Sequence, residues 1–138
     1  MVAEDIVQES FVALWRDTPA YDPDRGTLRS FLFGIARNLT LRHLRRNRPY
    51  DELAEDAAFI APIDVAGLER SEIVARAVGA LPPLQREAII LAEYEEMSLE
   101  EIARATGVEL AAVKSRLHRA RENLRRMLAP LLETKGAA

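Results

Sequence analysis

The segment spanning residues 98–121 places a helix cap, a turn glycine and a one-sided cationic helix in immediate succession. Ser98 and Glu101 have the spacing of a capping box, so a helix is expected to begin at Leu99. Gly107 can adopt the positive φ that a sharp turn requires. Two short helices around such a turn form a helix–turn–helix, which restricts the C-terminal part of the chain to a small set of helical folds.

The second helix of this unit is expected to be apolar on one side and cationic on the other. Apolar residues recur every three or four positions, a pattern typical of a single buried stripe. The stripe consists of Leu110, Val113, Leu117, Ala120, Leu124 and Met127 or Leu128. The opposite face carries Lys114, Ser115, His118, Arg119, Arg121 and Arg125. Such a helix is suited to the major groove of DNA, although a solvated arginine-rich face would show the same pattern.

Residue usage favours helices along the whole chain. The sequence is rich in Ala, Leu, Arg and Glu, and its β-branched residues never alternate with polar ones as in a half-buried strand. A length of 138 residues suffices for one ordinary domain or two small ones. These observations predict an all-α fold with two small helical modules joined by a linker.

Several functional classes are excluded by what the sequence lacks. With 0 cysteines it forms neither disulfides nor a thiolate metal site. It contains no apolar run of membrane-spanning length and no signal peptide, so we expect no membrane insertion and a cytoplasmic location. His43 and His118 lack a second ligand at metal spacing, and no P-loop, GxGxxG or Ser-His-Asp order occurs. We therefore expect no metal, no cofactor and no enzymatic activity.

The net charge of −3 conceals two cationic blocks. Seven arginines and no carboxylate occur from Arg25 to Arg48, and six basic residues with one acid occur from Lys114 to Arg126. The chain between these blocks is acidic. Two separated basic blocks indicate two surfaces that bind one polyanion.

Periodicity and helix breakers divide the chain into two modules. Pro19, Pro23 and Gly26 predict a non-helical loop over residues 18–26. Helices are expected at residues 3–17, 28–46, 68–81, 83–95, 99–106 and 110–128. The resulting organisation is a first module at 1–48, an acidic linker at 49–67 with weak helicity near 52–59, a four-helix helix–turn–helix module at 68–132 and a tail at 133–138.

The first module has only two evident helices. Their expected apolar sides consist of Ile6, Val7, Phe11, Leu14 and Trp15 in one helix and Leu28, Phe31, Leu32, Ile35 and Leu39 in the other. Two helices rarely bury enough surface to fold alone. We therefore expect a partner, a dimer mate or further residues to complete this module.

Two sets of short motifs follow one another along the chain. The first consists of Ala3-Glu-Asp-Ile-Val-Gln-Glu-Ser-Phe11, Trp15-Arg16, Tyr21-Asp-Pro-Asp-Arg-Gly26, Arg29-Ser-Phe-Leu32 and Ile35-Ala-Arg-Asn38. The second consists of Leu81-Pro-Pro-Leu-Gln-Arg-Glu-Ala, Ser98-Leu-Glu-Glu-Ile-Ala and Val113-Lys-Ser-Arg-Leu-His-Arg-Ala-Arg121. In this order and spacing they closely resemble regions two and four of the extracytoplasmic-function (ECF) sigma factors of RNA polymerase.

The resemblance implies functions for residues of the first module. Region two of the family docks on the β′ clamp helices of core RNA polymerase and opens the −10 promoter element. The positions that look toward the clamp match Asp5, Gln8 and Glu9. The positions expected near −10 DNA match Tyr21, Asp22, Asp24, Arg25, Arg37, Asn38, Arg42, Arg45 and Arg46. The amide of Asn38 suits a base edge, and the arginines suit phosphates.

The resemblance also implies functions for the second module. Region four of the family binds the −35 element and the β flap. The positions that face the −35 groove match Lys114, Ser115, Arg116, His118 and Arg119. Glu109-Leu-Ala-Ala112 departs from the Pro-x-Gly-Thr that is common before this helix. A second departure is at the front, where the family has one or two more helices before Ala3, so region two is expected to be partial.

Three functional hypotheses follow from these residues. The first is a sigma factor that directs core polymerase to promoters and is controlled by an anti-sigma factor. The second is a LuxR-like helix–turn–helix regulator that dimerises through residues 1–48; the arginine block argues against it, because dimer interface cores are depleted in charge. The third is a truncated decoy that occupies an anti-sigma factor without initiating transcription.

Overall fold

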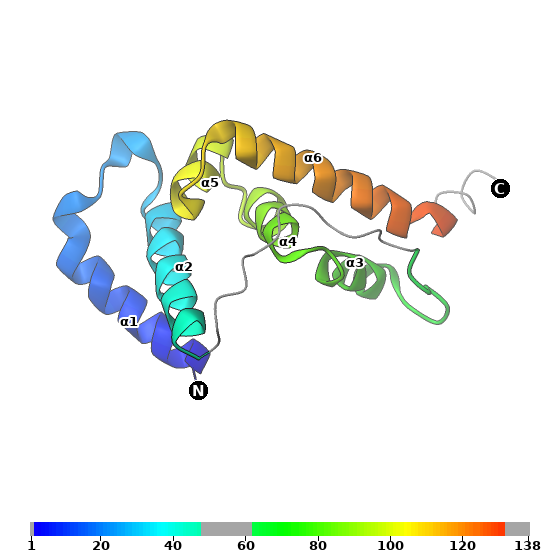
Figure 1. Ribbon diagram of the computed structural model, residues 1–138, viewed down its shortest axis with the longest axis horizontal. Helices are drawn as coiled ribbons and strands as arrows, with labels where there is room; N and C mark the ends of the chain where they lie inside the picture. The colour runs from blue at the N-terminus through cyan, green and yellow to red at the C-terminus, as the bar shows by residue number, and fades with distance from the viewer. Residues whose placement is uncertain (1, 48–61, 132–138) are drawn as a thin grey trace. The chain divides into compact units, whose positions relative to one another are not determined.

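The computed structural model describes residues 2–47 and 62–131, and every regular element in these ranges is helical (Figure 1). The α-helices are α1 (Val2–Asp17), α2 (Leu28–Asn47), α3 (Arg70–Gly79), α4 (Pro83–Ile89), α5 (Leu99–Thr106) and α6 (Leu110–Met127). Two 3₁₀ turns (Thr18–Ala20 and Pro23–Arg25) and a π-helical turn (Ile90–Tyr94) complete the elements. The predicted all-α fold is confirmed.

The loop before α2 differs from the expectation that it contains no helix. Its two 3₁₀ turns each have proline in their first positions. Pro19 and Pro23 supply the φ that a single helical turn needs, whereas longer helix is blocked by the missing N–H. The expected helix over 83–95 is present, but it widens at its end, where Glu95 N donates to Ile90 O at 3.0 Å.

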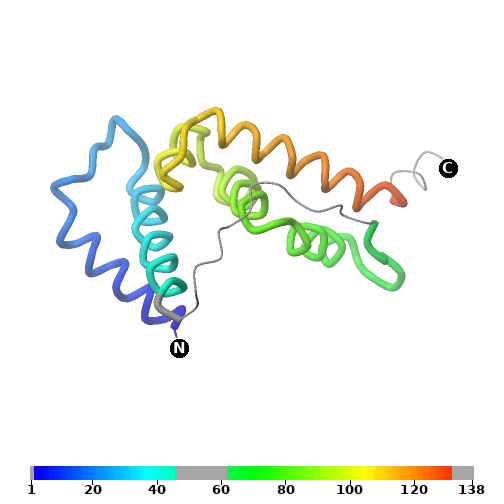
Figure 2. The backbone as a smooth tube through the Cα atoms, in the orientation of Figure 1, coloured from blue at the N-terminus to red at the C-terminus, as the bar shows by residue number. Residues whose placement is uncertain are grey.

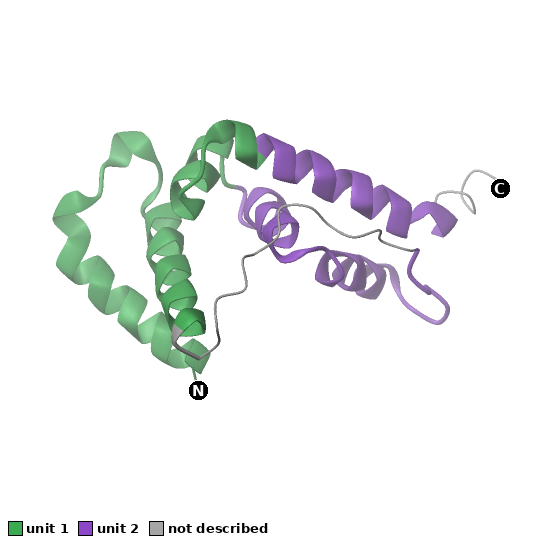
Figure 3. Cartoon of the chain, in the orientation of Figure 1, with its two compact units in different colours: residues 1–52, 97–113 green, residues 53–96, 114–138 purple. Residues whose placement is uncertain are grey.

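Contacts group the chain into two compact units that do not follow chain order (Figure 3). Unit 1 contains residues 1–52 and 97–113, which include α1, α2 and α5. Unit 2 contains residues 53–96 and 114–138, which include α3, α4 and most of α6. The module boundaries at 1–48 and 68–132 stay predictions. Most of the predicted acidic linker, with its weak helicity near 52–59, lies outside the described residues.

Within unit 1, α1 and α2 lie side by side as a helical hairpin, and α5 packs on α2 (Figure 2). Small side chains make these contacts close. Ser10 and Ala13 are the buried residues of α1, and Ser10 Oγ donates to Ile6 O at 2.6 Å. A Cβ added to Gly34 would lie 3.4 Å from Cα of Ala105, so the backbones of α2 and α5 approach closely at this point.

The expected buried side of α1 was partly wrong. Trp15 is 87% exposed, and Val7 and Phe11 are each more than half exposed. The buried residues of α1 are instead the small Ser10 and Ala13, and these bulky apolar residues lie in solvent. Leu28 at the start of α2 was also expected to be buried and is 46% exposed.

Unit 2 has a dense apolar interior. Its buried apolar residues are Ile73, Ala77, Val78, Leu81, Leu84, Ala88, Ile89, Leu91, Leu117, Ala120 and Met127. A polar pair is included in this core: Asn123 Nδ2 donates to Gln85 Oε1 at 2.6 Å, and both residues are buried. This bond joins α4 to α6 and satisfies two amides that would be costly to bury alone. In the predicted stripe of α6, Asn123 is buried and Leu124 is half-buried.

Candidate functional site

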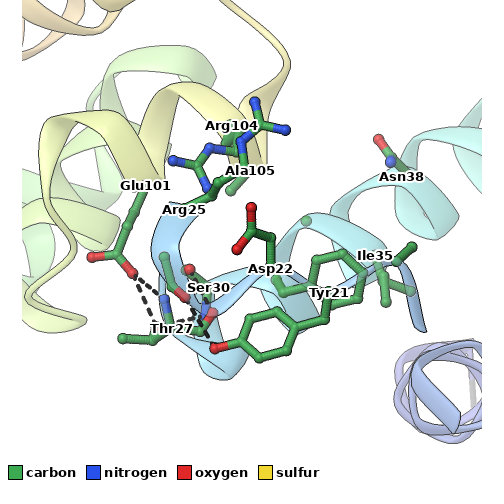
Figure 4. Close-up of a pocket in the computed structure, with 14 residues that line it drawn as sticks. Tyr21, Asp22, Arg25, Thr27, Ser30, Ile35, Asn38, Glu101, Arg104 and Ala105 are labelled. Atoms are coloured by element: carbon green, nitrogen blue, oxygen red, sulfur yellow. Dashed lines mark hydrogen bonds between the residues drawn. The ribbon is translucent and has the colours of Figure 1, made fainter. Parts of the chain in front are cut away.

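The loop between α1 and α2 is held in shape by its own side chains (Figure 4). The hydroxyl of Tyr21 donates to Gly26 O at 3.0 Å, and the Tyr21 ring packs on Phe31 with 5.6 Å between ring centroids. The carboxylate of Asp22 accepts from Asp24 N at 3.0 Å, which caps the second 3₁₀ turn. The loop therefore presents a fixed surface rather than a free coil.

Thr27 connects this loop to α2 and to α5. Its Oγ1 accepts from Ser30 N at 3.1 Å and caps α2. The same Oγ1 donates to Glu101 Oε2 at 2.9 Å, and Thr27 N donates to that oxygen at 3.0 Å. One carboxylate oxygen of α5 thus satisfies a backbone N–H at the start of α2, which the sequence did not predict.

Glu101 caps two helices at once. Its Oε1 accepts from Ser98 N, and Ser98 Oγ accepts from Glu101 N, each at 3.1 Å, so the predicted capping box is present. The pKa of Glu101 is lowered from 4.5 to about 2, mainly because the backbone N–H groups of Thr27 and Ser98 donate to its charged form. Glu101 is therefore ionised at every physiological pH.

A cavity of about 250 Å³ lies where the loop, α2 and α5 meet (Figure 4). Four of the predicted −10 residues line it together: Tyr21, Asp22, Arg25 and Asn38. Asp24 lines a neighbouring hollow with Arg25 and Arg104. The cavity offers an aromatic ring, a carboxylate, a guanidinium and an amide, which are the groups that recognise a nucleotide base and its phosphate.

Other predicted −10 residues lie apart from this cavity. Arg42 lines a separate groove between α1 and α2. Arg37 is half-buried and Arg45 is exposed. The side chain of Arg46 lies outside the described residues. The structure thus divides the predicted −10 set into a cavity group and arginines elsewhere along α2.

The three predicted polymerase-binding residues line the same groove as Arg42. Asp5, Gln8 and Glu9 are exposed on α1, and all three contribute to this groove. Val12 and Leu39 form its apolar part. Acidic and amide groups beside apolar surface are a combination that suits a basic helical partner.

The predicted −35 residues lie on α6, and four of the five are exposed: Lys114, Ser115, His118 and Arg119. The prediction that Arg116 faces the −35 groove is corrected, because this residue is only 6% exposed. It lies three residues after Val113 and next to Leu117, so the helical period turns it onto the buried stripe. Gly107 has φ +70° and ends α5, as the helix–turn–helix pattern predicted.

Sequence reasoning missed the contribution of α5 to the cavity. Arg104 and Ala105 line it, and Glu101 holds the adjoining loop. Gly34, which lacks a side chain in the middle of α2, was the available signal that another backbone approaches there. Nothing local identified that backbone as α5.

Within residues 2–47 and 62–131, no helix combines the length and apolarity needed to cross a bilayer. The same part of the chain contains no group of three or more His, Cys, Asp or Glu side chains placed to hold a metal ion.

Family comparisons agree with the two-part organisation of the motifs. Residues 1–50 match the family model described as Sigma-70 region 2, and residues 71–124 match Sigma-70, region 4. A chain with both regions is a sigma factor of the sigma-70 class.

Similar proteins of known function show to which group of sigma factors this chain belongs. The chain is 32% identical over 146 residues to the ECF RNA polymerase sigma factor SigW of Bacillus subtilis, covering 94% of this chain and 76% of the relative. It is 34% identical to the RNA polymerase sigma-H factor of Pseudomonas aeruginosa, covering 94% of this chain and 75% of that one. The protein belongs to the ECF family of RNA polymerase sigma factors, and its function is to direct core polymerase to promoters.

Solved structures share the fold. The sigma factor RpoE of Bartonella quintana, in complex with the anti-sigma factor NepR, matches with a TM-score of 0.64 and 27% identity, over 91% of this chain and 80% of that one. CnrH in complex with the cytosolic domain of CnrY matches with a TM-score of 0.56 and 30% identity, over 95% of this chain and 71% of that one.

Proposed function

We propose that the cavity at the start of α2 receives a base of the −10 element. Asn38 and Asp22 provide hydrogen-bonding groups for a base edge, and Arg25 provides charge for a neighbouring phosphate. The observation that carries this proposal is the convergence of Tyr21, Asp22, Arg25 and Asn38 on one cavity. Arg37, Arg42, Arg45 and Arg46 contribute to the same function as phosphate contacts along α2.

The exposed cationic face of α6 contacts the −35 element in this proposal. Lys114, His118 and Arg119 supply groups for base edges or phosphates, and Ser115 supplies a hydroxyl for a phosphate oxygen. The burial of Arg116 favours a supporting position for that residue beneath the DNA-facing side chains.

The groove between α1 and α2 is the proposed docking surface for the β′ clamp helices of core polymerase. Asp5, Gln8 and Glu9 provide its polar groups. The β flap is the proposed partner of the second module, residues 68–132. An anti-sigma factor is a further proposed partner, because two structural relatives are complexes with such proteins or their domains.

The remaining expectations follow from this function. A sigma factor acts where polymerase and promoter meet, so we place the chain in the cytoplasm. Chemistry is carried out by the polymerase, so the chain itself is not an enzyme. A LuxR-like regulator or a decoy is less consistent with matches to both sigma regions.

Run-off transcription with core polymerase tests the promoter function. Binding to a −35 duplex tests the proposed roles of individual residues on α6. Arg119→Ala should weaken binding to a −35 duplex by about 1–3 kcal/mol if Arg119 reads a base. Arg126→Ala is the matched control, because Arg126 is exposed in the last turn of the same helix and is not among the predicted −35 residues. Unchanged affinity of the Arg119 variant would remove that residue from the interface.

A second pair of substitutions tests the polymerase-docking groove. Gln8→Ala with Glu9→Ala should reduce binding to core polymerase and spare −35 duplex binding, because both residues lie on α1. Equal loss of both activities would indicate unfolding rather than a lost contact.

A further inference from the structure

One long side of α1 carries apolar side chains that are exposed to solvent. Val7, Phe11 and Trp15 follow one another at intervals of four residues, so they form a single stripe along the helix. Each of the three is more than half exposed. Ala13 is two residues from both aromatic rings, so it points to the other side of the helix, and it is buried. The stripe therefore lies on the side of α1 opposite its buried residues, and Figure 3 shows α1 at the edge of unit 1.

The stripe is large enough to be an interaction surface. An aromatic side chain buries about 150–250 Å² when it is fully covered, so Phe11 and Trp15 together leave about 300 Å² of ring surface open in each copy. Val7 and Val12, which are also more than half exposed, extend this surface. Contiguous apolar patches of this size commonly mark a site of association.

The charges beside the stripe suit a second copy of the same helix. Asp5 and Arg16 are separated by about three helical turns, so they share one flank of the stripe, at its two ends. When two copies of α1 pair antiparallel about Phe11, Asp5 of each copy comes opposite Arg16 of the other. Parallel pairing would instead place Asp5 beside Asp5 and Arg16 beside Arg16, which is repulsive. The surface is thus self-complementary in the antiparallel arrangement.

Both charged side chains are accessible for this pairing. Asp5 is exposed, and the side chain of Arg16 is 72% exposed. Arg16 Nε lies 3.7 Å from Asp17 Oδ1, a long contact between solvated groups that contributes little to stability. Val12 lies on the same flank between Asp5 and Arg16, so the flank has an apolar centre and a charge at each end.

We propose that this chain forms an antiparallel dimer through α1. Val7 of each copy packs on Trp15 of the other, around a central pair of Phe11 rings. The interface is formed by α1, so the arginine block of α2, which argues against dimerisation through residues 1–48 as a whole, lies outside its core. The second copy covers the apolar surface that the two helices of the first module leave exposed.

The area of the stripe indicates how strong this association is. Two copies contribute about 600 Å² of aromatic surface. Specific interfaces of standard size bury about 1,200–2,000 Å², of which a little more than half is apolar. The proposed interface is at the small end of this range, where association is reversible. We expect a dissociation constant of about 10–100 μM.

The dimer and core polymerase compete for one surface. The groove proposed to dock on the polymerase is lined by Asp5, Gln8, Val12 and Arg16, and the dimer covers this flank of α1. This competition rests on the proposed function of the groove, whereas the dimer itself does not. One chain is therefore either paired with its copy or bound to polymerase.

Trp15 is the sole tryptophan of the chain and reports directly on the interface. Its emission should shift to the blue as the concentration of the chain rises from about 1 to 300 μM, and sedimentation velocity should show conversion of monomer to dimer over that range. Phe11→Gln should raise the dissociation constant about tenfold or more, because it removes the central ring. Leu44→Gln is the matched control, because Leu44 is 50% exposed but belongs to α2.

Charge exchange tests the antiparallel arrangement. Asp5→Lys or Arg16→Glu alone should raise the dissociation constant about three- to tenfold, because each variant replaces two attractive pairs by two repulsive ones. An equimolar mixture of the two variants should regain the affinity of the parent, because each mixed dimer contains two pairs of opposite charge. Circular dichroism of each variant checks that the helices are retained.

Three results would overturn the proposal. A chain that sediments as a monomer throughout, with unchanged Trp15 emission, would show that no second copy occupies the stripe. A dimer that persists in Phe11→Gln would place the interface elsewhere. A mixture of the charge variants that associates no better than either alone would exclude the antiparallel pairing of Asp5 with Arg16.

Core polymerase separates the failure of this proposal from the failure of the proposed function. Excess polymerase added to the parent dimer should yield complexes that contain one chain per polymerase. Complexes with two chains would refute the competition for the groove. If no complex forms, the proposed polymerase docking is refuted, while the dimer is still judged by the sedimentation of the chain alone.

Discussion

The helical hairpin of unit 1 and the core of unit 2 are held together in different ways. In unit 2, large side chains such as Leu81 and Met127 are almost completely buried in a helical core. In the hairpin, the buried residues of α1 are the small Ser10 and Ala13, while Trp15 is left in solvent. The proposed −35 helix thus extends from a packed core, whereas the proposed −10 loop depends mainly on hydrogen bonds and half-buried side chains.

This difference fits the two tasks of a sigma factor. Reading duplex DNA requires a rigid helix, which a dense core provides. Elements with few buried apolar side chains open at lower free-energy cost, so we expect the hairpin of α1 and α2 to be less stable than the core of unit 2. The following predictions test this contrast, from the largest expected effect to the smallest.

Truncation of a leucine side chain should lower the free energy of unfolding much more in unit 2 than in the hairpin of unit 1. Leu81 is 2% exposed in unit 2, and Leu81→Ala should lower the free energy of unfolding by about 2–5 kcal/mol. Leu28 is 46% exposed in unit 1, and Leu28→Ala should change it by about 0.5 kcal/mol or less. Urea unfolding followed by circular dichroism measures both, and equal losses would contradict the contrast.

The buried amide pair of unit 2 should be the next most sensitive feature. Asn123→Leu leaves Gln85 buried without its donor and should cost about 1–3 kcal/mol. The double variant with Gln85→Leu should recover part of this loss, because no amide is then left unsatisfied. Equilibrium unfolding of the two single variants and the double variant gives the coupling. Additive losses would show that the 2.6 Å bond contributes little.

Acid should weaken unit 1 through Glu101. Because its folded pKa is about 2 and its ordinary value is 4.5, the charged form stabilises the fold fully above about pH 4.5. This contribution should be lost as the pH falls from 4.5 toward 2. The NMR shift of the Thr27 amide proton should report this titration, and Glu101→Gln should abolish it. A midpoint near 4.5 would show that the hydrogen bonds from Thr27 are not maintained.

The exposed face of α1 should be the least sensitive to substitution. Trp15 is 87% exposed, so Trp15→Gln should change the free energy of unfolding by about 0.5 kcal/mol or less in the isolated chain. Ala13→Leu is the matched comparison on the buried face, where overpacking should cost about 1–3 kcal/mol. A large loss for the Trp15 variant would show that another surface covers this face in solution.

Local signals in the sequence were sufficient for the six α-helices, although not for the two 3₁₀ turns or the π-helical turn. The capping box of Ser98 and Glu101, the left-handed Gly107 and the cap at Thr27 all depend on residues within a few positions of one another. Their geometry was predictable because such motifs act through the nearest backbone groups. In the predicted stripe of α6, Val113, Leu117, Ala120 and Met127 are buried and Leu110 and Leu124 are half-buried. The polar residues Arg116 and Asn123 occupy buried positions that the sequence did not predict.

Long-range partners were not predictable in this way. Glu101 caps a helix whose first turn lies 74 residues earlier, and no periodicity in either segment indicates the pairing. The apolar face of α1 was also misjudged, because periodicity identifies an apolar side without saying which part of it meets a neighbour. The buried positions of α1 are held by the small residues Ser10 and Ala13, which an apolar pattern does not single out.

The sequence by itself determined that this chain is helical, that it has a helix–turn–helix with a cationic face, and that its motifs are those of an ECF sigma factor. These properties depend on local capping, helical period and motif order. The tertiary structure alone decided that α5 lies on α2, that four of the predicted −10 residues share one cavity and that Arg116 is buried. Those outcomes depend on which distant surfaces fit together, and shape complementarity between distant segments is not encoded in any local pattern.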